Sequence, residues 1–408
     1  MTNEARALQA LKAKIAGEEL SERQYRDVLN AVIAGELSRS DFQRFLIAAQ
    51  SLSVEEVAAI AKVRAELAPA CEWSEPLVVD KQSLGGVPGN RITLIVVPIV
   101  AAYGLAMPKA SSRAITSAAG TADAMEVLAR VDLSIDEVKK VVERARGCIA
   151  WTKRLNHSAL DDIVNAVTRP LQLDMARWSV ASIVSKKVSA GVTHLVVDLP
   201  YGPFTKLKSR DNAADIAKLF SATGERFGIA IECEISECCE PVGKGIGPAL
   251  EVRDALSVLE GTPSAPADLR EKALRFAARI LSWAPGIGTE QAGLAEARGL
   301  LSSGAARAAL DRIVDAQGRR PPVASPQLTV AVKAGRAGTV AAINGWVMSG
   351  IARQAGAPAD RAAGVYLQVK TGEQVSAGDT LYEIHANEQA ALAAAQRYSE
   401  RDRGVQIG

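Results

Sequence analysis

Four short runs of almost entirely apolar residues constrain the fold of this chain more than any other feature. They are Leu77–Asp80, Cys148–Trp151, Leu195–Asp198 and Ile229–Glu232. Strands that are buried on both faces read as continuous apolar runs, whereas half-exposed strands alternate. Helix signals separate the runs, such as Ser134 followed three residues later by Glu137 in a capping box. We therefore expect an α/β domain with a mixed or parallel sheet.

The chain on either side of this region carries different signals. Residues 1–67 contain stop-and-restart signals such as Gly17 followed by Ser21, which are typical of short helices. Residues 175–190 again have a helical pattern. After a linker with three prolines at 318–326, short strands alternate with Gly-rich turns, which indicates a separate α+β module.

Composition excludes several classes of protein. A net charge of +2 and 4% aromatic residues argue against a nucleic-acid partner, but leave room for a local basic pocket that binds a small anion. The apolar stretch Leu94–Ala102 contains Pro98 and is too short to span a bilayer, and Met1–Gly17 has no signal-peptide core. Five cysteines favour a reducing compartment. We expect a soluble, cytoplasmic protein without a membrane partner.

Metal binding is not expected. The spacing of Cys233, Cys238 and Cys239 matches no paired Cys-x-x-Cys site, and no histidine lies near them in the sequence.

A Gly-rich segment follows the first apolar run. Lys81 and Ser83 precede Gly85, Gly86 and Gly89. Glycines allow backbone N–H groups to approach an anion closely, while lysine adds charge and serine adds a donor. The spacing fits neither standard nucleotide loop, so a plain turn after a strand is the alternative.

A second segment is rich in hydroxyls. Residues 111–117 hold four hydroxyl side chains and an arginine, and a good helix former begins near Thr121. A helix starting at Thr121 would direct free N–H groups at an anion. Alternatively, Thr121 and Asp123 are only capping residues. Two such segments in one α/β domain favour phosphate binding.

A third segment contains Arg169, Asp174, Ser182 and Lys186. Ser182 and Lys186 are four residues apart and share one helix face. Asp174 precedes that helix, and aspartate is a preferred N-cap residue, so Asp174 is alternatively only the N-cap of the helix.

Together these segments resemble the thymidine phosphorylase family, and within it the branch of the AMP phosphorylases. The most specific motifs are Ser112–Ser117 with Gly120–Asp123, Gly86–Arg91, Gly245–Glu251 and Lys370–Asp379. The resemblance implies a homodimer and three domains. These are a discontinuous helical domain (1–67 plus about 158–190), an α/β phosphate-binding domain (75–157 plus 191–320) and a C-terminal α+β domain (325–408). It also implies a buried helix at 92–103, where residue propensity alone favours a strand.

The resemblance assigns roles to particular residues. Positions that hold inorganic phosphate correspond to Lys81, Ser83, Thr93, Ser111 and Thr121. Positions that hold the base correspond to Arg169, Ser182 and Lys186. Nucleotide-binding positions correspond to Gly86, Ser112, Arg113, Ala114, Ile115, Thr116, Ser117, Thr121, Ser182 and Lys206. Asp174 matches the proton donor, so Asp174, Arg169 and Lys186 are the expected catalytic residues.

The implied activity is phosphorolysis of a nucleoside or a nucleoside 5′-monophosphate, which yields a free base and a sugar 1-phosphate. Inorganic phosphate is then a co-substrate, and no other cofactor is expected. Gln82 stands where the family has a histidine, and a glutamine cannot titrate. This departure leaves two alternatives: a phosphorylase of an atypical base or sugar phosphate, and a paralogue that binds phosphate or nucleotide without turnover.

Overall fold

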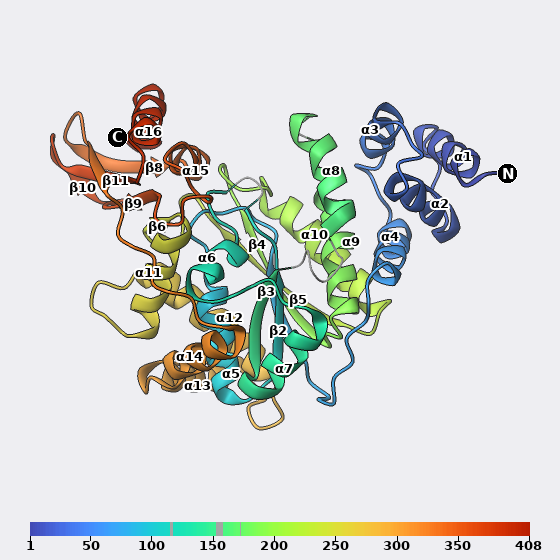
Figure 1. The fold of residues 1–408 in the computed structure, drawn as a ribbon, viewed down its shortest axis with the longest axis horizontal. Coiled ribbons are helices and arrows are strands. Elements are labelled where there is room, and N and C mark those ends of the chain that lie inside the picture. The colour runs from blue at the N-terminus through green and yellow to red at the C-terminus, as the bar shows by residue number, and fades with distance from the viewer. Residues whose placement is uncertain (115–116, 152–157, 172) are drawn as a thin grey trace. The chain divides into compact units, whose positions relative to one another are not determined.

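A computed structural model describes residues 1–114, 117–151, 158–171 and 173–408 of the chain (Figure 1). The described chain divides into two compact units. The first comprises Met1–Leu84, Thr152–Leu199 and Arg210–Ile235, and the second comprises Gly85–Trp151, Pro200–Ser209 and Ser236–Gly408.

The first unit combines helices with a three-stranded sheet. Its helices are α1 (Asn3–Ile15), α2 (Glu22–Ile33), α3 (Arg39–Ala48), α4 (Val54–Glu66), α8 (Ser158–Leu171), α9 (Ala176–Ser189) and α10 (Arg210–Glu225). Its strands are β1 (Val79–Ser83), β4 (His194–Tyr201) and β5 (Ala230–Glu237), in the order β1-β4-β5. β1 and β4 run parallel, with Val79 opposite His194 and Ser83 opposite Asp198. The parallel pairing predicted from the apolar runs is confirmed for these two strands.

Local signals explain why the helices of the first unit begin where they do. The Ser21 side chain accepts from the backbone N–H of Gln24, and the Gln24 side chain accepts from Ser21 in return. α4 begins with the same capping box, so in both helices two of the backbone donors at the start are satisfied by side chains. Tyr25 and Phe45 are fully buried and meet edge to face, with ring centroids 6.2 Å apart.

The second unit contains a parallel strand pair and most of the buried helices. Its first elements are α5 (Thr93–Tyr103), β2 (Met107–Ser111), α6 (Thr121–Leu128), α7 (Ile135–Ala145) and β3 (Gly147–Trp151). They are followed by β6 (Gly245–Ile246), α11 (Pro248–Leu259), α12 (Ala267–Ser282), α13 (Glu290–Ser302) and α14 (Ala305–Gln317). β2 and β3 pair in parallel, with Met107 opposite Gly147.

Residues 93–103 form a helix, as the resemblance implies and against their strand propensity. Every residue from Thr93 to Ala101 is buried, and α5 packs against α12, α13 and α14 (Figure 1). A helix satisfies its backbone hydrogen bonds internally, so it suits a segment that is apolar all round and enclosed by other helices. The helix ends at Gly104, whose φ of 107° is a left-handed value that favours glycine.

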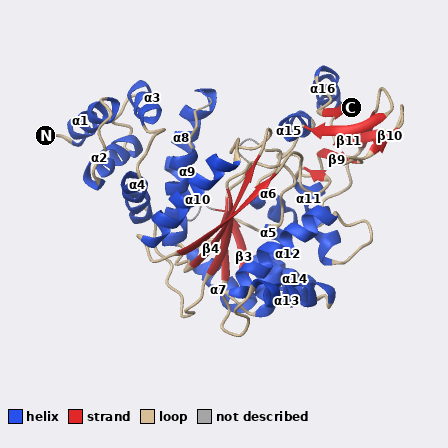
Figure 2. Ribbon diagram, turned by 180° about the vertical axis from the view of Figure 1, so that it is seen from behind, coloured by secondary structure: helices blue, strands red, loops and turns tan. Residues whose placement is uncertain are grey.

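The C-terminal part of the second unit is an α+β module. It contains β7 (Leu328–Lys333), β8 (Gly338–Ile343), α15 (Gly345–Gln354), β9 (Gly364–Leu367), β10 (Gln374–Val375), β11 (Thr380–Ala386), α16 (Gln389–Arg401) and β12 (Val405–Ile407). One sheet has the order β6-β9-β11-β7 and another has the order β10-β8-β12. Figure 2 shows strands of this module beside α15 and α16. Because β6 is the edge strand beside β9, the 245–251 motif joins this module to the rest of its unit.

The described chain contains no helix that is both long enough and apolar enough to cross a membrane. The predicted division into three domains stays a prediction.

Candidate functional site

The Gly-rich loop after β1 is held in place by backbone contacts that require glycine. Gly86 and Gly89 have φ values of 69° and 71°. A Cβ on Gly89 would lie 2.1 Å from the carbonyl oxygen of Val242, so no side chain fits there. Arg91, which follows the loop, forms a buried ion pair with Glu251 of α11. It also donates to the carbonyl oxygen of Ala119, so the loop is tied to the second hydroxyl-rich segment.

That second segment folds over the start of α6. Thr121 is the first residue of the helix, as predicted, and Gly120 is its N-cap. Asp123 Oδ2 accepts from the backbone N–H groups of Ala114 at 2.6 Å and Gly120 at 2.8 Å. A Cβ on Gly120 would lie 2.4 Å from the carbonyl carbon of Arg113. The Asp123 carboxylate therefore caps the helix and fixes the segment above it.

Arg113 is held by two acidic side chains and one aromatic ring. Its guanidinium is 2.6 Å from Glu126 Oε2 and 3.0 Å from Asp123 Oδ1, and it lies 4.4 Å from the ring centroid of Trp151. The hydrogen bond from Arg113 holds the pKa of Glu126 below its usual range. Arg113 thus anchors the 112–117 segment, of which Ile115 and Thr116 lie outside the described residues.

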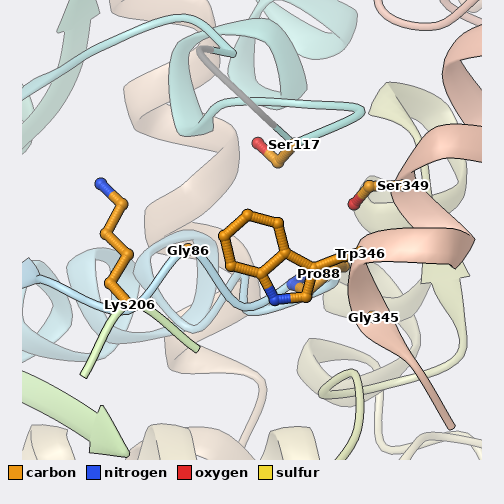
Figure 3. A pocket seen from close by; sticks show the side chains of 7 residues that line it. All are labelled: Gly86, Pro88, Ser117, Lys206, Gly345, Trp346 and Ser349. Atoms are coloured by element: carbon orange, nitrogen blue, oxygen red, sulfur yellow. The ribbon is translucent and has the colours of Figure 1, made fainter. Parts of the chain in front are cut away.

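A pocket lies beside these two segments (Figure 3). It is lined by Gly86, Pro88, Ser117, Lys206, Gly345, Trp346 and Ser349. Three of the residues predicted from the sequence, Gly86, Ser117 and Lys206, therefore lie around one cavity. The Lys206 backbone N–H donates to the carbonyl oxygen of Gly85 at 3.0 Å, which places this lysine beside the Gly-rich loop.

Gly345, Trp346 and Ser349 were not foreseen from the sequence. The available signal was local: Asn344 is a good N-cap residue, and an exposed tryptophan follows it two positions later. Nothing in that pattern indicates that the helix start at Gly345 lies beside Pro88, a loop residue 257 positions earlier in the chain.

The predicted phosphate-binding residues of the second unit lie at the ends of secondary structure elements. Thr93 begins α5, Ser111 ends β2, and Thr121 begins α6. Thr93 and Ser111 are buried, and Thr121 is half-buried. The carboxyl end of a parallel strand and the first turn of a helix are common places for anion-binding groups in α/β proteins.

The first unit holds Lys81 and Ser83 on β1. Lys81 is buried, and the Ser83 hydroxyl donates to Asp198 Oδ2 of the neighbouring strand at 3.0 Å. Between the two lies Gln82, at the position where the resemblance found in the sequence implies a histidine. Asp80, directly before Lys81, forms a buried ion pair with Lys187 of α9 at 2.6 Å. The start of β1 is thereby fixed to α9.

Ser182 and Lys186 of α9 converge on one carboxylate. Asp161 of α8 accepts from Lys186 Nζ at 2.5 Å and from the Ser182 hydroxyl at 2.9 Å. Arg64 of α4 donates to the same carboxylate at 2.5 Å. Burial by itself raises the pKa of Asp161, but Lys186 and Arg64 outweigh it and hold the pKa below its usual range.

This group, which we call the Asp161 cluster (Arg64, Asp161, Ser182 and Lys186), confirms that Ser182 and Lys186 share a helix face. Neither Asp161 nor Arg64 was predicted from the sequence. Arg169 lies on α8, and its side chain is outside the described residues.

Asp174 lies just before α9 and is exposed. Its Oδ1 accepts from the backbone N–H of Ala176 at 3.0 Å, while its own backbone N–H donates to Gln50 Oε1 at 3.2 Å. The N-cap residue of α9 is Met175 rather than Asp174. The Asp174 carboxylate nevertheless satisfies one of the free donors of the first turn.

Among the residues that the structure describes, no group of three or more His, Cys, Asp or Glu side chains is arranged to hold a metal ion.

Comparison with known proteins gives two family matches. Residues 75–307 match the model described as "Glycosyl transferase family, a/b domain". Residues 339–401 match the "Pyrimidine nucleoside phosphorylase C-terminal domain". The two matches lie on either side of the linker at 318–326.

Curated relatives are similar over nearly the whole chain. A bifunctional ribose 1,5-bisphosphokinase-thymidine phosphorylase of Azorhizobium caulinodans is 56% identical over 95% of this chain, and the chain spans 56% of that protein's length. A putative thymidine phosphorylase of Methylococcus capsulatus is 43% identical over 98% of this chain, which spans 78% of its length.

Among solved structures, the chain is similar to anthranilate phosphoribosyltransferase from Thermus thermophilus. The TM-score is 0.63 at 20% sequence identity, with 76% of this chain and 99% of that chain covered. At this identity the similarity establishes a shared α/β fold, which confirms the predicted fold class.

Proposed function

The chain belongs to the glycosyl transferase family defined by that α/β domain, and on this premise we propose that it catalyses the phosphorolysis of a nucleoside 5′-monophosphate. In this reaction an oxygen of inorganic phosphate attacks C1′ of the sugar while the bond from C1′ to the base nitrogen breaks. The products are the free base and a sugar 1,5-bisphosphate. Inorganic phosphate is the co-substrate, and no other cofactor is required.

The observation that carries the proposal is the pocket of the second unit. Gly86, Ser117 and Lys206 line it together. An ammonium group, a hydroxyl and a glycine with left-handed backbone are the groups that commonly bind a phosphate monoester. We therefore assign the 5′-phosphate of the substrate to this pocket. Ser112, Arg113, Ala114, Ile115, Thr116 and Thr121 complete the proposed nucleotide-binding set.

The name of a relative supports a nucleotide over an unphosphorylated nucleoside. The Azorhizobium caulinodans protein combines a thymidine phosphorylase with a ribose 1,5-bisphosphokinase. Phosphorolysis of a ribonucleoside 5′-monophosphate adds a phosphate at C1 of a ribose that already carries one at C5, so its product is ribose 1,5-bisphosphate. A kinase for that compound in the same polypeptide is explained if the phosphorylase part supplies it.

The remaining residues take the following proposed roles. Inorganic phosphate is bound by Lys81 and Ser83, and by Thr93, Ser111 and Thr121. The departing base is recognised by Arg169, Ser182 and Lys186, and Asp174 donates the proton that it needs to leave as a neutral molecule. The transition state has oxocarbenium character, so the attacking phosphate anion also stabilises it electrostatically.

We further propose the cellular setting that fits this activity. The enzyme is an AMP phosphorylase-type pentosyltransferase of the cytoplasm, assembled as a homodimer with three domains per chain.

Phosphorolysis of an unphosphorylated nucleoside such as thymidine is the second candidate. The names of the relatives favour it, and Gln82 disfavours it because a family-type histidine is missing from β1. A chain that binds nucleotide without turnover is the third, and it is motivated by the same residue.

The test is a substrate panel in which each ribonucleoside 5′-monophosphate is paired with its nucleoside. The full chain is incubated with inorganic phosphate, and free base is measured by chromatography while sugar phosphates are measured by ³¹P NMR. The expected result is base and ribose 1,5-bisphosphate from at least one nucleotide and much slower release from its nucleoside. Release from nucleosides alone would establish the second candidate, and no release at all would establish the third.

A further inference from the structure

The pocket assigned to the 5′-phosphate is lined by two groups of residues, and only one of them was predicted from the sequence. One side consists of Gly86, Ser117 and Lys206, and the other consists of Gly345, Trp346 and Ser349 of α15. We propose that Trp346 and Ser349 are specificity-determining residues, which bind the phosphorylated end of the substrate together with Lys206. This proposal rests on the proposed function and names a role for the C-terminal module in it.

α15 is seated directly on the Gly-rich loop. A Cβ added to Gly345 would lie 3.0 Å from Cδ of Pro88, so the first turn of the helix is already in tight contact with the loop. Ala118, the neighbour of Ser117, is fully buried within the hydrophobic core that contains Met348 and Ile351. The C-terminal module therefore contacts the Gly-rich loop through the start of α15, and it also holds the hydroxyl-rich segment in position through Ala118.

Ser349 has the properties of a ligand-binding side chain. It is only 5% exposed, and within the described part of the chain no hydrogen bond or ion pair of its hydroxyl is found. A nearly buried hydroxyl that lacks a protein partner needs another one, because an unsatisfied polar group is costly. Ser349 lines the pocket, so a ligand there meets that requirement.

The backbone N–H groups at the start of α15 do not supply the recognition. Asn344 Oδ1 already accepts from the N–H of Trp346 at 3.0 Å and from that of Val347 at 3.3 Å. Side chains must therefore provide the specific contacts. The positive charge comes from Lys206 and a hydroxyl donor comes from Ser349, because the Ser117 hydroxyl already donates to the carbonyl oxygen of Ala119 at 2.7 Å.

Trp346 supplies an apolar wall next to this charge. Its side chain is 49% exposed, although an indole is costly to leave in water. Figure 3 shows the ring extending from α15 toward Lys206, with Ser117 and Ser349 along one side of it. Lys208 Nζ lies 5.5 Å from the ring centroid and donates to the carbonyl oxygen of Thr205 at 2.7 Å. A ring in this place covers the pocket and keeps water from the phosphate contacts, which strengthens them.

The first experiment compares nucleotide and nucleoside kinetics in three variants. Ser349→Ala and Trp346→Leu test the proposal, and Ser376→Ala, an exposed serine of the same module, is the matched control. For Ser349→Ala we expect the KM of the nucleotide to rise by about tenfold, the effect of one hydrogen bond to a charged group. We expect a similar or larger rise for Trp346→Leu. The kcat/KM of the corresponding nucleoside should change less than about twofold in both, since it carries no phosphate. Unchanged nucleotide kinetics in both variants would overturn the proposal while leaving phosphorolysis intact.

A second experiment does not depend on turnover. Binding of ribose 5-phosphate and of ribose is measured by isothermal titration calorimetry, after circular dichroism has shown that each variant is folded. The wild type and the Ser376→Ala variant should bind ribose 5-phosphate alike, and Ser349→Ala and Trp346→Leu should bind it about tenfold more weakly or worse. The proposal is wrong if the wild type binds ribose as tightly as it binds ribose 5-phosphate. It is also wrong if the variants bind ribose 5-phosphate as tightly as the wild type does. Absence of base release from every substrate would instead refute the proposed function, and the calorimetry would still decide the role of α15.

Discussion

Replacing Asp161 with asparagine should destabilise the first unit and impair catalysis at the same time. Asp161 is the one carboxylate of the Asp161 cluster and accepts from Arg64, Ser182 and Lys186. The side chains of Arg64 and Lys186 are only 4% and 17% exposed. In the Asp161→Asn variant the two cations remain buried without a counter-charge, and the amide can accept through one oxygen only.

The magnitude follows from the burial of the partners. Removing one member of a buried ion pair typically costs about 3–5 kcal/mol, because the remaining charge is left uncompensated. The Asp161 side chain is itself 20% exposed, so water can reach the cluster and the lower end of that range applies. A loss of about 3 kcal/mol corresponds to a fall in Tm of roughly 6–12 °C for a cooperative unit of 150–250 residues. Since Lys186 and Ser182 are proposed to hold the base, kcat/KM should fall by about tenfold or more.

The pH dependence provides an independent check of the charge. Lys186 and Arg64 depress the pKa of Asp161 in the folded protein. A carboxylate with a depressed pKa stabilises the fold above its unfolded pKa of about 3.9, and this contribution is lost as the pH falls toward the folded value. The difference in Tm between wild type and Asp161→Asn should therefore be constant above about pH 5 and shrink as the pH falls below about 4.

The assay is thermal unfolding followed by circular dichroism, with initial rates of base release measured on the same samples. Asp162→Asn is the matched control, because Asp162 is the exposed neighbour on the same helix. It should change Tm by less than about 1 °C. If Asp161→Asn unfolds at the wild-type temperature, or if the control is equally destabilised, the cluster does not have the role that its geometry indicates.

Three further substitutions test the proposed roles. Lys81→Ala should raise the KM for inorganic phosphate and lower kcat, with a combined cost of about 2–4 kcal/mol; an unchanged phosphate KM in initial-rate measurements would exclude Lys81 from the phosphate site. Asp174→Asn keeps an oxygen that can accept from Ala176, so Tm should stay near that of the wild type while base release collapses; a variant that keeps its activity would show that Asp174 only satisfies a backbone donor in the first turn of α9. Gln82→His should increase thymidine kcat/KM and introduce a pH dependence near the ordinary histidine pKa of about 6.5. Strong thymidine turnover by the wild type, or no gain in the variant, would remove Gln82 as a determinant of specificity.

Some features of this fold could be read from neighbouring residues. The capping boxes at Ser21 and Ser53 are complete in the structure, because a cap involves residues only three positions apart. The apolar runs at 77–80 and 195–198 mark β1 and β4, which pair in parallel as their patterns predict. The strand propensity of residues 93–103 gave the wrong secondary structure by itself, since packing against other helices outweighs a difference of a few tenths of a kcal/mol per residue.

In the candidate site, too, some residues could be predicted from the sequence and others could not. Motif residues such as Gly86, Ser117 and Lys206 were identified from the sequence, and the structure places them around one pocket. Asp161 was passed over, because an aspartate on a helix is usually a solvent-exposed residue. Its contacts with Arg64, 97 positions earlier in the chain, and with Ser182 and Lys186 of α9 distinguish it from its neighbour Asp162.

By itself the sequence determined the class of fold, the starts of the helices and the residue types available for phosphate chemistry, since all of these depend on patterns that repeat within a few residues. The tertiary structure decided which of those residues meet. Trp346 and Ser349 belong to the pocket only because Gly345 packs on Pro88 and Ala118 is buried in the C-terminal core. Contacts between segments so distant in the chain form because they bury apolar surface over the whole unit. The local periodicity of the sequence does not predict which distant segments will pack together.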